Sequence, residues 1–293
     1  MNPKVSKIAL GTVQFGINYG ISNLRGKVPE SESLRILASC KGLGIDTLDT
    51  AAAYGDSESV LGSAFAKLGR HSAFRVISKF SASSQQSVDL EIKASLARLG
   101  LESLYGYLLH HVADLRDHPE LWDQLSLAKT TGLVEKIGFS LYSPSELLEL
   151  LDLGLKPDLI QIPFSVFDRR FETVFERCRN EEIEVHSRSA FLQGLVFLEP
   201  ESLSPHFHNA APVLRKLKVL SQKSEISIAH LCLGFCLLNP SLQRVVIGVE
   251  SNTNLEENAI VESLLDRVEL IMPDLDGLAI SDESILLPTL WPK

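Results

Sequence analysis

The 293-residue sequence has few cysteines and places none of them in a ligand pattern. Its four cysteines, Cys40, Cys178, Cys232 and Cys236, form no CxxC motif and no Cys/His spacing typical of a zinc site. Cys232 and Cys236 stand four residues apart in an apolar stretch, so we expect them to share a helix face and to pack as small hydrophobic side chains. A metal or redox role for this pair is the alternative, and the sequence predicts no metal site.

Long apolar runs and clusters of positive charge are also lacking. The longest apolar stretch, LCLGFCLL at 231–238, is far shorter than the roughly 20 residues that span a bilayer. The net charge is −9, and no run of Lys and Arg could neutralise several neighbouring phosphates. The N-terminal residues lack the apolar segment and the cleavage pattern of a signal peptide. We therefore expect a cytoplasmic protein that binds neither nucleic acid nor membrane.

The sequence does have a repeated alternation of short apolar runs and longer amphipathic segments, which is typical of alternating strands and helices. The short runs are 7–13, 45–51, 74–80, 104–111, 136–141, 159–165, 184–191 and 244–249. Eight strands separated by crossovers predict a parallel (β/α)8 TIM barrel, a single α/β domain over residues 1–293. An open doubly wound sheet is the alternative, but GTVQFGINYG after the first strand lacks the GxGxxG pattern.

Several helix boundaries are marked chemically. SPSE at 143–146 has the serine, proline and glutamate of a capping box, and TNLE at 253–256 matches its S/T-x-x-E part. Helices are predicted over 86–100, 210–224 and 226–238, the last as an extra element before the eighth strand. Glycines at 44, 69, 100, 132 and 154 are expected where helices end.

Polar residues stand at or just after the carboxyl ends of the predicted strands, where barrel enzymes carry their chemistry. They are Gln14, Asp49, Tyr54, Lys79, His110, His111, Ser140, Gln161 and Arg188. Taken singly, Asp49 is equally suited to a helix cap, Tyr54 to a loop anchor and Lys79 to a solvated strand end. Taken together they have a chemical logic, because a phenol with a pKa of about 10 needs a nearby ammonium to become a better acid.

At this point the sequence resembles the aldo-keto reductases. DTAAAYG at 49–55 matches that family's DTAxxYG signature, VISKF at 76–80 its strand ending in the catalytic lysine, and YGYLLHH at 105–111 its strand ending in the catalytic histidine. The motifs expected of the fifth to eighth strands follow in order, so the resemblance covers nearly the whole chain. It implies an NAD(P)(H)-dependent oxidoreductase that transfers hydride between nicotinamide C4 and a small carbonyl or alcohol substrate.

The resemblance also implies roles for individual residues. Tyr54 would be the general acid, Lys79 would lower its pKa, Asp49 would support Lys79, and His110 would position the substrate oxygen. Because side chains alternate between the two faces of a strand, only one of His110 and His111 points inward. The alignment with the family motif favours His110 as the catalytic histidine. The implied cofactor-binding residues are Gly11, Thr12, Ser140, Gln161, Arg188, Ser189, Phe191, Gln193, Gly194, Gly248, Val249, Glu250, Ser251, Asn254, Glu257 and Asn258.

Two departures from the family's pattern bear on the cofactor. Arg188 stands where an aromatic residue usually stacks on the nicotinamide, although a guanidinium plane can stack as well. Where NADPH-specific members have Lys or Arg near the 2′-phosphate, this chain has Gly248 and Asn254, with Glu250 nearby. We therefore expect NADH to be accepted at least as well as NADPH.

The sequence leaves the substrate, the direction of reaction and the oligomeric state open. The opening LGTVQFGINYGISNLRGK looks like bacterial members associated with sugar or polysaccharide biosynthesis, which suggests a sugar-like substrate. The alternatives are a cofactor-binding regulatory or scaffold barrel with little turnover, and redox-neutral chemistry such as epimerisation on a retained nicotinamide.

Overall fold

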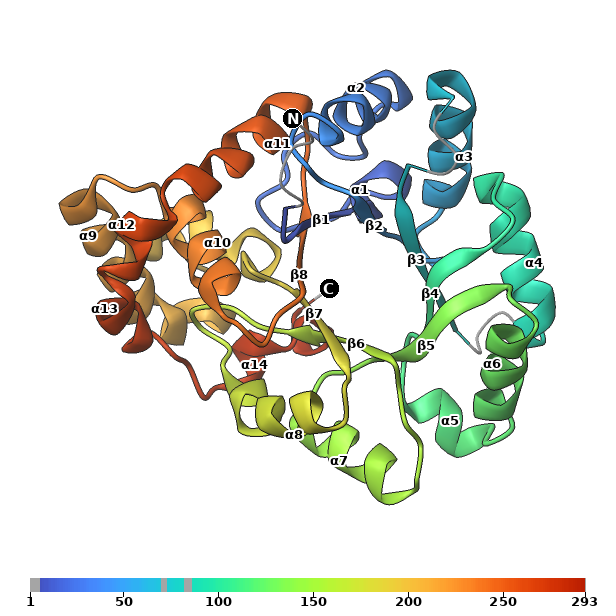
Figure 1. Cartoon of the computed structure of the whole chain (residues 1–293). Helices are drawn as coiled ribbons and strands as arrows, with labels where there is room; N and C mark the ends of the chain where they lie inside the picture. Colours follow the sequence, from blue (N-terminus) through green and yellow to red (C-terminus); the bar gives the residue numbers. More distant parts are fainter. Residues whose placement is uncertain (1–5, 70–72, 82–85, 293) are drawn as a thin grey trace.

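Eight parallel strands close into a barrel in the order β1 to β8 in the computed structural model, which describes residues 6–69, 73–81 and 86–292 (Figure 1). The strands are β1 Ile8–Gly11, β2 Thr47–Asp49, β3 Arg75–Phe80, β4 Leu104–Leu109, β5 Val134–Ser140, β6 Leu159–Pro163, β7 Glu184–Arg188 and β8 Arg244–Gly248. Closure is visible at Leu10, which pairs with Leu48 on one side and Ile247 on the other. The predicted (β/α)8 fold is confirmed; residues 1–5, 70–72, 82–85 and 293 of the predicted domain lie outside the described residues.

The helices surround the strands in Figure 1. They are α1 Val13–Gly16, α2 Glu30–Cys40, α3 Ser57–Leu68, α4 Val88–Leu99, α5 Ala113–Asp117, α6 Leu121–Thr130, α7 Pro144–Asp152, α8 Phe175–Asn180, α9 Ala211–Ser224, α10 Ile228–Leu238, α11 Asn252–Ala259, α12 Leu265–Glu269, α13 Met272–Asp276 and α14 Glu283–Leu286. Short 3-10 turns lie at η2 Arg170–Val174, η3 Leu192–Phe197, η4 Pro200–Ser202, η5 Pro205–Ala210, η6 Ile260–Ser263 and η7 Pro288–Leu290. In the described part of the chain no helix is both long and apolar enough to cross a membrane.

The capping patterns were only partly interpreted correctly. Ser143 forms the predicted capping box with Glu146 at the start of α7, and Gly69 and Gly100 end α3 and α4 in the left-handed region. The prediction for 253–256 was wrong, because α11 begins two residues earlier and its cap is Ser251, which accepts from Asn254 N. The turn that leaves β8 brings Ser251 to the helix start before Thr253 is reached.

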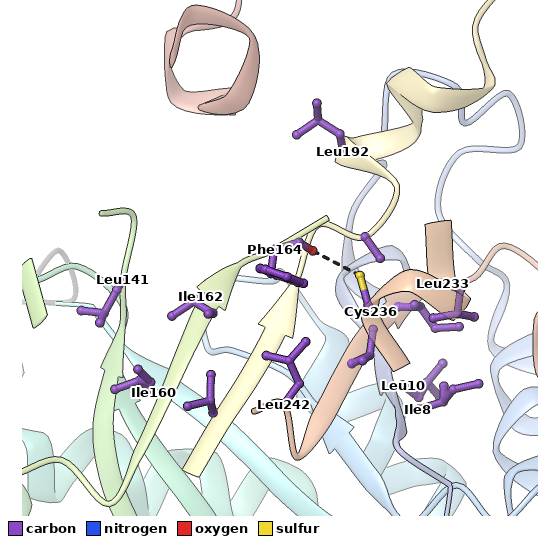
Figure 2. Close-up of a cluster of buried hydrophobic side chains, with 14 of the residues drawn as sticks. Ile8, Leu10, Leu141, Ile160, Ile162, Phe164, Leu192, Leu233, Cys236 and Leu242 are labelled. Carbon is purple, nitrogen blue, oxygen red and sulfur yellow. Dashed lines mark hydrogen bonds between the residues drawn. The ribbon is translucent and has the colours of Figure 1, made fainter. Parts of the chain in front are cut away.

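The core lies between the strands and the surrounding helices. Ile160 and Ile162 of β6, and Phe164 just after it, lie opposite α10, where the Cys236 thiol approaches the Phe164 carbonyl oxygen at 3.5 Å (Figure 2). Cys236 and its neighbour on the same face, Cys232, are both fully buried. Burial raises the pKa of the Cys232 thiol to about 12, so both cysteines act as small apolar side chains, as predicted.

Tyr54 is positioned by a close contact between two backbone turns. A Cβ on Gly16, at the end of α1, would lie 1.6 Å from the Tyr54 carbonyl oxygen. Gly55 has a φ of +60°, and a Cβ there would lie 2.7 Å from the Gly16 carbonyl oxygen. Neither position can carry a side chain without moving the turn. The glycine of the DTAxxYG motif is thus required by backbone geometry beside the tyrosine.

We predict that Gly16→Ala lowers the free energy of unfolding by about 1–3 kcal/mol, because the added methyl must displace the Tyr54 backbone. Gly42→Ala is the matched control, since a Cβ there has only the Ser39 carbonyl oxygen near it, at 3.6 Å. Urea unfolding of both variants measures the difference. Equal stability of the two variants would contradict the close approach of the two turns.

Candidate active site

A cavity of about 1100 Å³ opens at the carboxyl ends of the strands. It receives residues from the ends of β1, β2, β4, β5, β6, β7 and β8 and from the loops that follow them. The C-terminal segment borders it as well, through Pro288 and Thr289. The polar residues predicted at separate strand ends therefore converge on one mouth.

The predicted site residues fall around this cavity with two exceptions. Lys79 lies behind Asp49 and is 1% exposed, and Val249 is buried outside the cavity. The predicted residues that line the cavity are Gly11, Thr12, Asp49, Tyr54, His110, Ser140, Gln161, Arg188, Ser189, Phe191, Gln193, Gly194, Gly248, Glu250, Ser251, Asn254, Glu257 and Asn258. In the described part of the chain no group of three His, Cys, Asp or Glu side chains could hold a metal ion.

A buried ion pair forms the floor of the cavity. The Lys79 ammonium donates to both Asp49 carboxylate oxygens, at 2.7 and 2.8 Å, and to the Thr50 carbonyl oxygen at 2.9 Å. Gln161, from β6, donates its side-chain amide to Asp49 Oδ1 at 2.7 Å. Burial lowers the pKa of Lys79, and the Asp49 charge and hydrogen bond oppose that effect. The carboxylate is therefore fully engaged, and Gln161 supports the ion pair, a contact that the sequence did not reveal.

The Tyr54 hydroxyl lies 3.4 Å from Lys79 Nζ, within reach of the same ammonium. The pKa of Tyr54 is nevertheless raised, first by burial and then by the negative charge of Asp49, while Arg188 opposes the rise. The rise is a net effect led by burial, and the lowering of this pKa by Lys79 stays a prediction. Tyr54 is thus a protonated phenol, with its proton available for donation.

His110 lies beside Tyr54, with the two rings 5.9 Å apart and nearly perpendicular. Burial lowers the pKa of His110 to about 3, and the positive charges of Lys79, His111 and Arg188 contribute. Its ring is therefore neutral at physiological pH. The Nδ1 atom is buried and has no hydrogen-bond partner among the residues that the structure describes. A neutral imidazole of this kind can hydrogen-bond a substrate oxygen without protonating it outright.

Aromatic rings extend from His110 along one wall of the cavity. The His111 ring stacks on His110 at 4.8 Å, and the Tyr142 ring lies parallel to His111 at 6.4 Å. The guanidinium of Arg188 lies 4.4 Å from the centre of the Tyr142 ring. Tyr142 was not predicted as a site residue, although it follows Ser140 by two positions.

The loop after β7 is conformationally strained where it meets the cavity. Ser189, Leu192 and Gln193 have φ values of 68°, 44° and 51°, in the left-handed region that non-glycine residues rarely adopt. The Gln193 carbonyl oxygen accepts from Ile21 N, in the loop after β1, at 2.9 Å. This backbone hydrogen bond joins two loops that line the same cavity.

The α11 side of the cavity has the form of an anion-binding helix start. Ser251 caps α11, and Gly248, at the end of β8, faces Gln14, whose Oε1 atom is buried without a hydrogen-bond partner in the described residues. Asn254 and Glu257 line the cavity from α11. Residues that were not predicted as site residues also line it: Val13, Ser227, Ala229, His230 and Thr253. No sequence motif marks the contribution of α10, which follows from where that helix packs.

Comparison with known proteins identifies the family. The sequence model of the aldo/keto reductase family matches residues 7–268 of this chain. The chain therefore belongs to the aldo/keto reductase family, a family of NAD(P)-dependent oxidoreductases. The structure is similar to the holo form of aldo-keto reductase AKR11C1 from Bacillus halodurans, with a TM-score of 0.75 and 22% identity over 94% of this chain and 93% of the other. That likeness supports the fold.

Two relatives illustrate the similarity in sequence. The NADH-specific methylglyoxal reductase of Escherichia coli is 27% identical over 217 residues, 66% of this chain and 65% of the relative. The alignment thus spans slightly less than two thirds of that protein. The uncharacterized oxidoreductase YqkF of Bacillus subtilis is 25% identical over 279 residues, 86% of this chain and 89% of the relative.

The lowered pKa of His110 predicts a specific dependence of stability on pH. Since the folded-state pKa is about 3 and the unfolded value is about 6.5, the unfolded chain takes up the proton first as pH falls. The part of the free energy of unfolding that depends on a neutral His110 ring is fully present above about pH 6.5 and decreases below it. We expect the loss between pH 6.5 and 4.5 to be smaller in His110→Gln than in the parent chain, measured by urea unfolding. His118→Gln, at an exposed position, is the control and should keep the parent slope.

Proposed function

We propose that this chain is a carbonyl reductase that uses a reduced nicotinamide cofactor. The observation that carries the proposal is the contact of one buried ammonium with Asp49, Thr50 and Tyr54 at the floor of the cavity. A protonated phenol directed by a neutralised ammonium is a proton donor, and the neutral His110 beside it is a hydrogen-bonding group. Together they provide a place for an oxygen that becomes negatively charged during reduction.

The described residues fit a nicotinamide dinucleotide. The cavity is large enough for a cofactor with a small substrate, because ligand pockets usually measure about 300–1000 Å³. Two buried polar atoms that have no hydrogen-bond partner in the described residues belong to residues that line it: Gln14 Oε1, beside Gly248, and Nδ1 of His110, which lies beside Tyr54. Gly248 and Ser251 would hold phosphate groups at the start of α11, Glu257 and Asn258 the adenine, and Ser140 the carboxamide.

When bound, the reduced nicotinamide supplies hydride to the carbonyl carbon. Tyr54 gives its proton to the carbonyl oxygen, and His110 holds that oxygen in line. Lys79 stabilises the phenolate left on Tyr54, because its ammonium is 3.4 Å from the hydroxyl. Asp49 and Gln161 keep Lys79 in place, and a proton from solvent restores the phenol.

The decisive variant is Tyr54→Phe, which removes the proton donor and keeps the ring. We expect kcat for reduction to fall by about a hundredfold to ten-thousandfold, the range typical of a lost general acid. The Kd of NADH should change little, since the ring still fills its place. Consumption of NADH against a panel of aldehydes and ketones gives the first value, and fluorescence titration gives the second.

Tyr107→Phe is the matched control, because Tyr107 is fully buried on β4 and does not line the cavity. It should keep kcat within about threefold of the parent. If Tyr54→Phe reduced carbonyls at the parent rate, the proposed chemistry would be wrong. If the parent chain bound NADH without consuming it, a regulatory or redox-neutral role would be the better interpretation.

The proposed cofactor is NADH, accepted at least as well as NADPH. The residues of the β8–α11 region that line the cavity include Glu250 and Asn254 but no Lys or Arg. A carboxylate accepts hydrogen bonds from a free ribose diol and repels a 2′-phosphate. The E. coli relative, described as NADH-specific, points in the same direction.

Glu250→Lys should raise kcat/KM for NADPH relative to NADH by roughly tenfold or more, since it replaces repulsion by attraction at the 2′-phosphate. Glu256→Lys, on α11 but outside the cavity, is the control and should leave the ratio unchanged. Initial rates with both cofactors measure the ratio. A hundredfold preference of the parent chain for NADPH would refute the assignment.

The proposed substrate is a small hydroxylated, sugar-like carbonyl compound. The support is the set of hydrogen-bonding side chains around the mouth, which includes Tyr19, His111 and Tyr142. Hydroxyl groups on the substrate would pair with these side chains. A substrate panel that compares hydroxylated with alkyl aldehydes of equal length tests the preference through kcat/KM.

A further inference from the structure

Arg188 lines the cavity together with the residues of its two functional halves. Tyr54, Lys79 and His110 come from β2, β3, β4 and their loops, whereas Gly248 to Asn258 come from β8 and α11. Arg188 ends β7, next to β8 in the closed barrel. A dinucleotide that is held at α11 and reaches Tyr54 with its nicotinamide therefore occupies the cavity that Arg188 lines.

No carboxylate of the residues that the structure describes compensates the charge of Arg188. Its guanidinium donates to the Leu141 carbonyl oxygen at 3.1 Å and to Ser189 Oγ at 3.4 Å, and it lies 4.4 Å from the Tyr142 ring centre. All three partners are neutral. Within the described residues no Asp or Glu lies within ion-pair distance of it. Lys79 differs in this respect, because Asp49 neutralises it.

The positive field of Arg188 extends to the reaction centre. It opposes the rise in the pKa of Tyr54 that burial and Asp49 cause. It also adds to the lowering of the pKa of His110, for which burial is the main cause. A group that influences both residues also acts on any ring placed beside them.

We infer that Arg188 makes the site bind the reduced nicotinamide more tightly than the oxidised one, and so favours carbonyl reduction over alcohol oxidation. The inference rests on the proposed function. In the reaction, a hydride carries two electrons from nicotinamide C4 to the carbonyl carbon, and Tyr54 supplies the proton that completes the alcohol. The nicotinamide ring, neutral before the transfer, becomes positively charged. An uncompensated guanidinium close to it raises the free energy of that charged form only.

The test compares equilibrium binding of NADH and NAD⁺ by fluorescence titration and calorimetry. Two unit charges about 7 Å apart at an effective dielectric constant of about 20 repel strongly enough to change Kd by more than tenfold. In Arg188→Gln we therefore expect the ratio Kd(NAD⁺)/Kd(NADH) to fall by roughly tenfold or more. Arg188→Lys keeps the charge and should stay within about threefold of the parent ratio.

Arg25→Gln is the control for a general change of charge, since Arg25 is an exposed cation that lines the same cavity. Its ratio should equal that of the parent chain. An unchanged ratio in Arg188→Gln, in a variant that binds NADH and melts like the parent, would overturn the inference and leave the proposed function intact. A parent chain that binds neither cofactor would overturn both.

The competing role for Arg188 is capture of an anionic substrate. It is tested with 4-formylbenzoate and its neutral analogue 4-formylbenzamide. If Arg188→Gln raised KM for the carboxylate alone and left the cofactor ratio unchanged, the arginine would serve the substrate and the inference would be wrong. If the ratio fell and KM changed equally for both aldehydes, the inference would be supported.

Discussion

The ion pair between Asp49 and Lys79 is the interaction on which the rest of the site depends. Two charges removed from water are tolerated only when they are paired and their remaining hydrogen-bonding groups are satisfied. Here Gln161 and the Thr50 carbonyl oxygen complete the set. Contacts among β2, β3 and β6 thus hold the Lys79 ammonium in place. The Tyr54 hydroxyl then lies within 3.4 Å of it.

The two cations of the site, Lys79 and Arg188, differ in whether a carboxylate neutralises them. Lys79 is buried against a carboxylate and acts locally, as a donor to Tyr54. Among the described residues Arg188 has only neutral partners, and its charge acts at longer range on Tyr54 and His110. Burial, and after it the charge of Asp49, raises the pKa of Tyr54 although an ammonium lies 3.4 Å from its hydroxyl. A charge neutralised by a carboxylate, as on Lys79, acts mainly on the group it contacts. A charge without such a partner, as on Arg188, changes the electrostatic potential over a wider region.

The sequence was sufficient to predict the barrel, because buried parallel strands are short apolar runs and eight of them recur between amphipathic segments. It also placed Asp49, Tyr54 and His110 at one mouth, since strand ends of a closed barrel share a face.

The contact between Gln161 and Asp49 could not be predicted, because it joins positions 112 residues apart whose meeting depends on barrel closure. Tyr142 under Arg188 was missed for a similar reason: a loop conformation, not a strand register, brings the ring there. The cap of α11 was assigned to Thr253 because a local motif was read without the turn that precedes it.

The contact of Gly16 with the turn that carries Tyr54 divides the first loop into two parts with different tolerance to engineering. Gly16 supports the turn of the proton donor, whereas four residues of the following stretch, Tyr19, Gly20, Ser22 and Arg25, border the cavity. Grafting foreign loops onto β/α barrels is an established way to change what they accept. In this chain a graft that begins at residue 17 leaves the tyrosine supported, and one that begins four residues earlier removes its support.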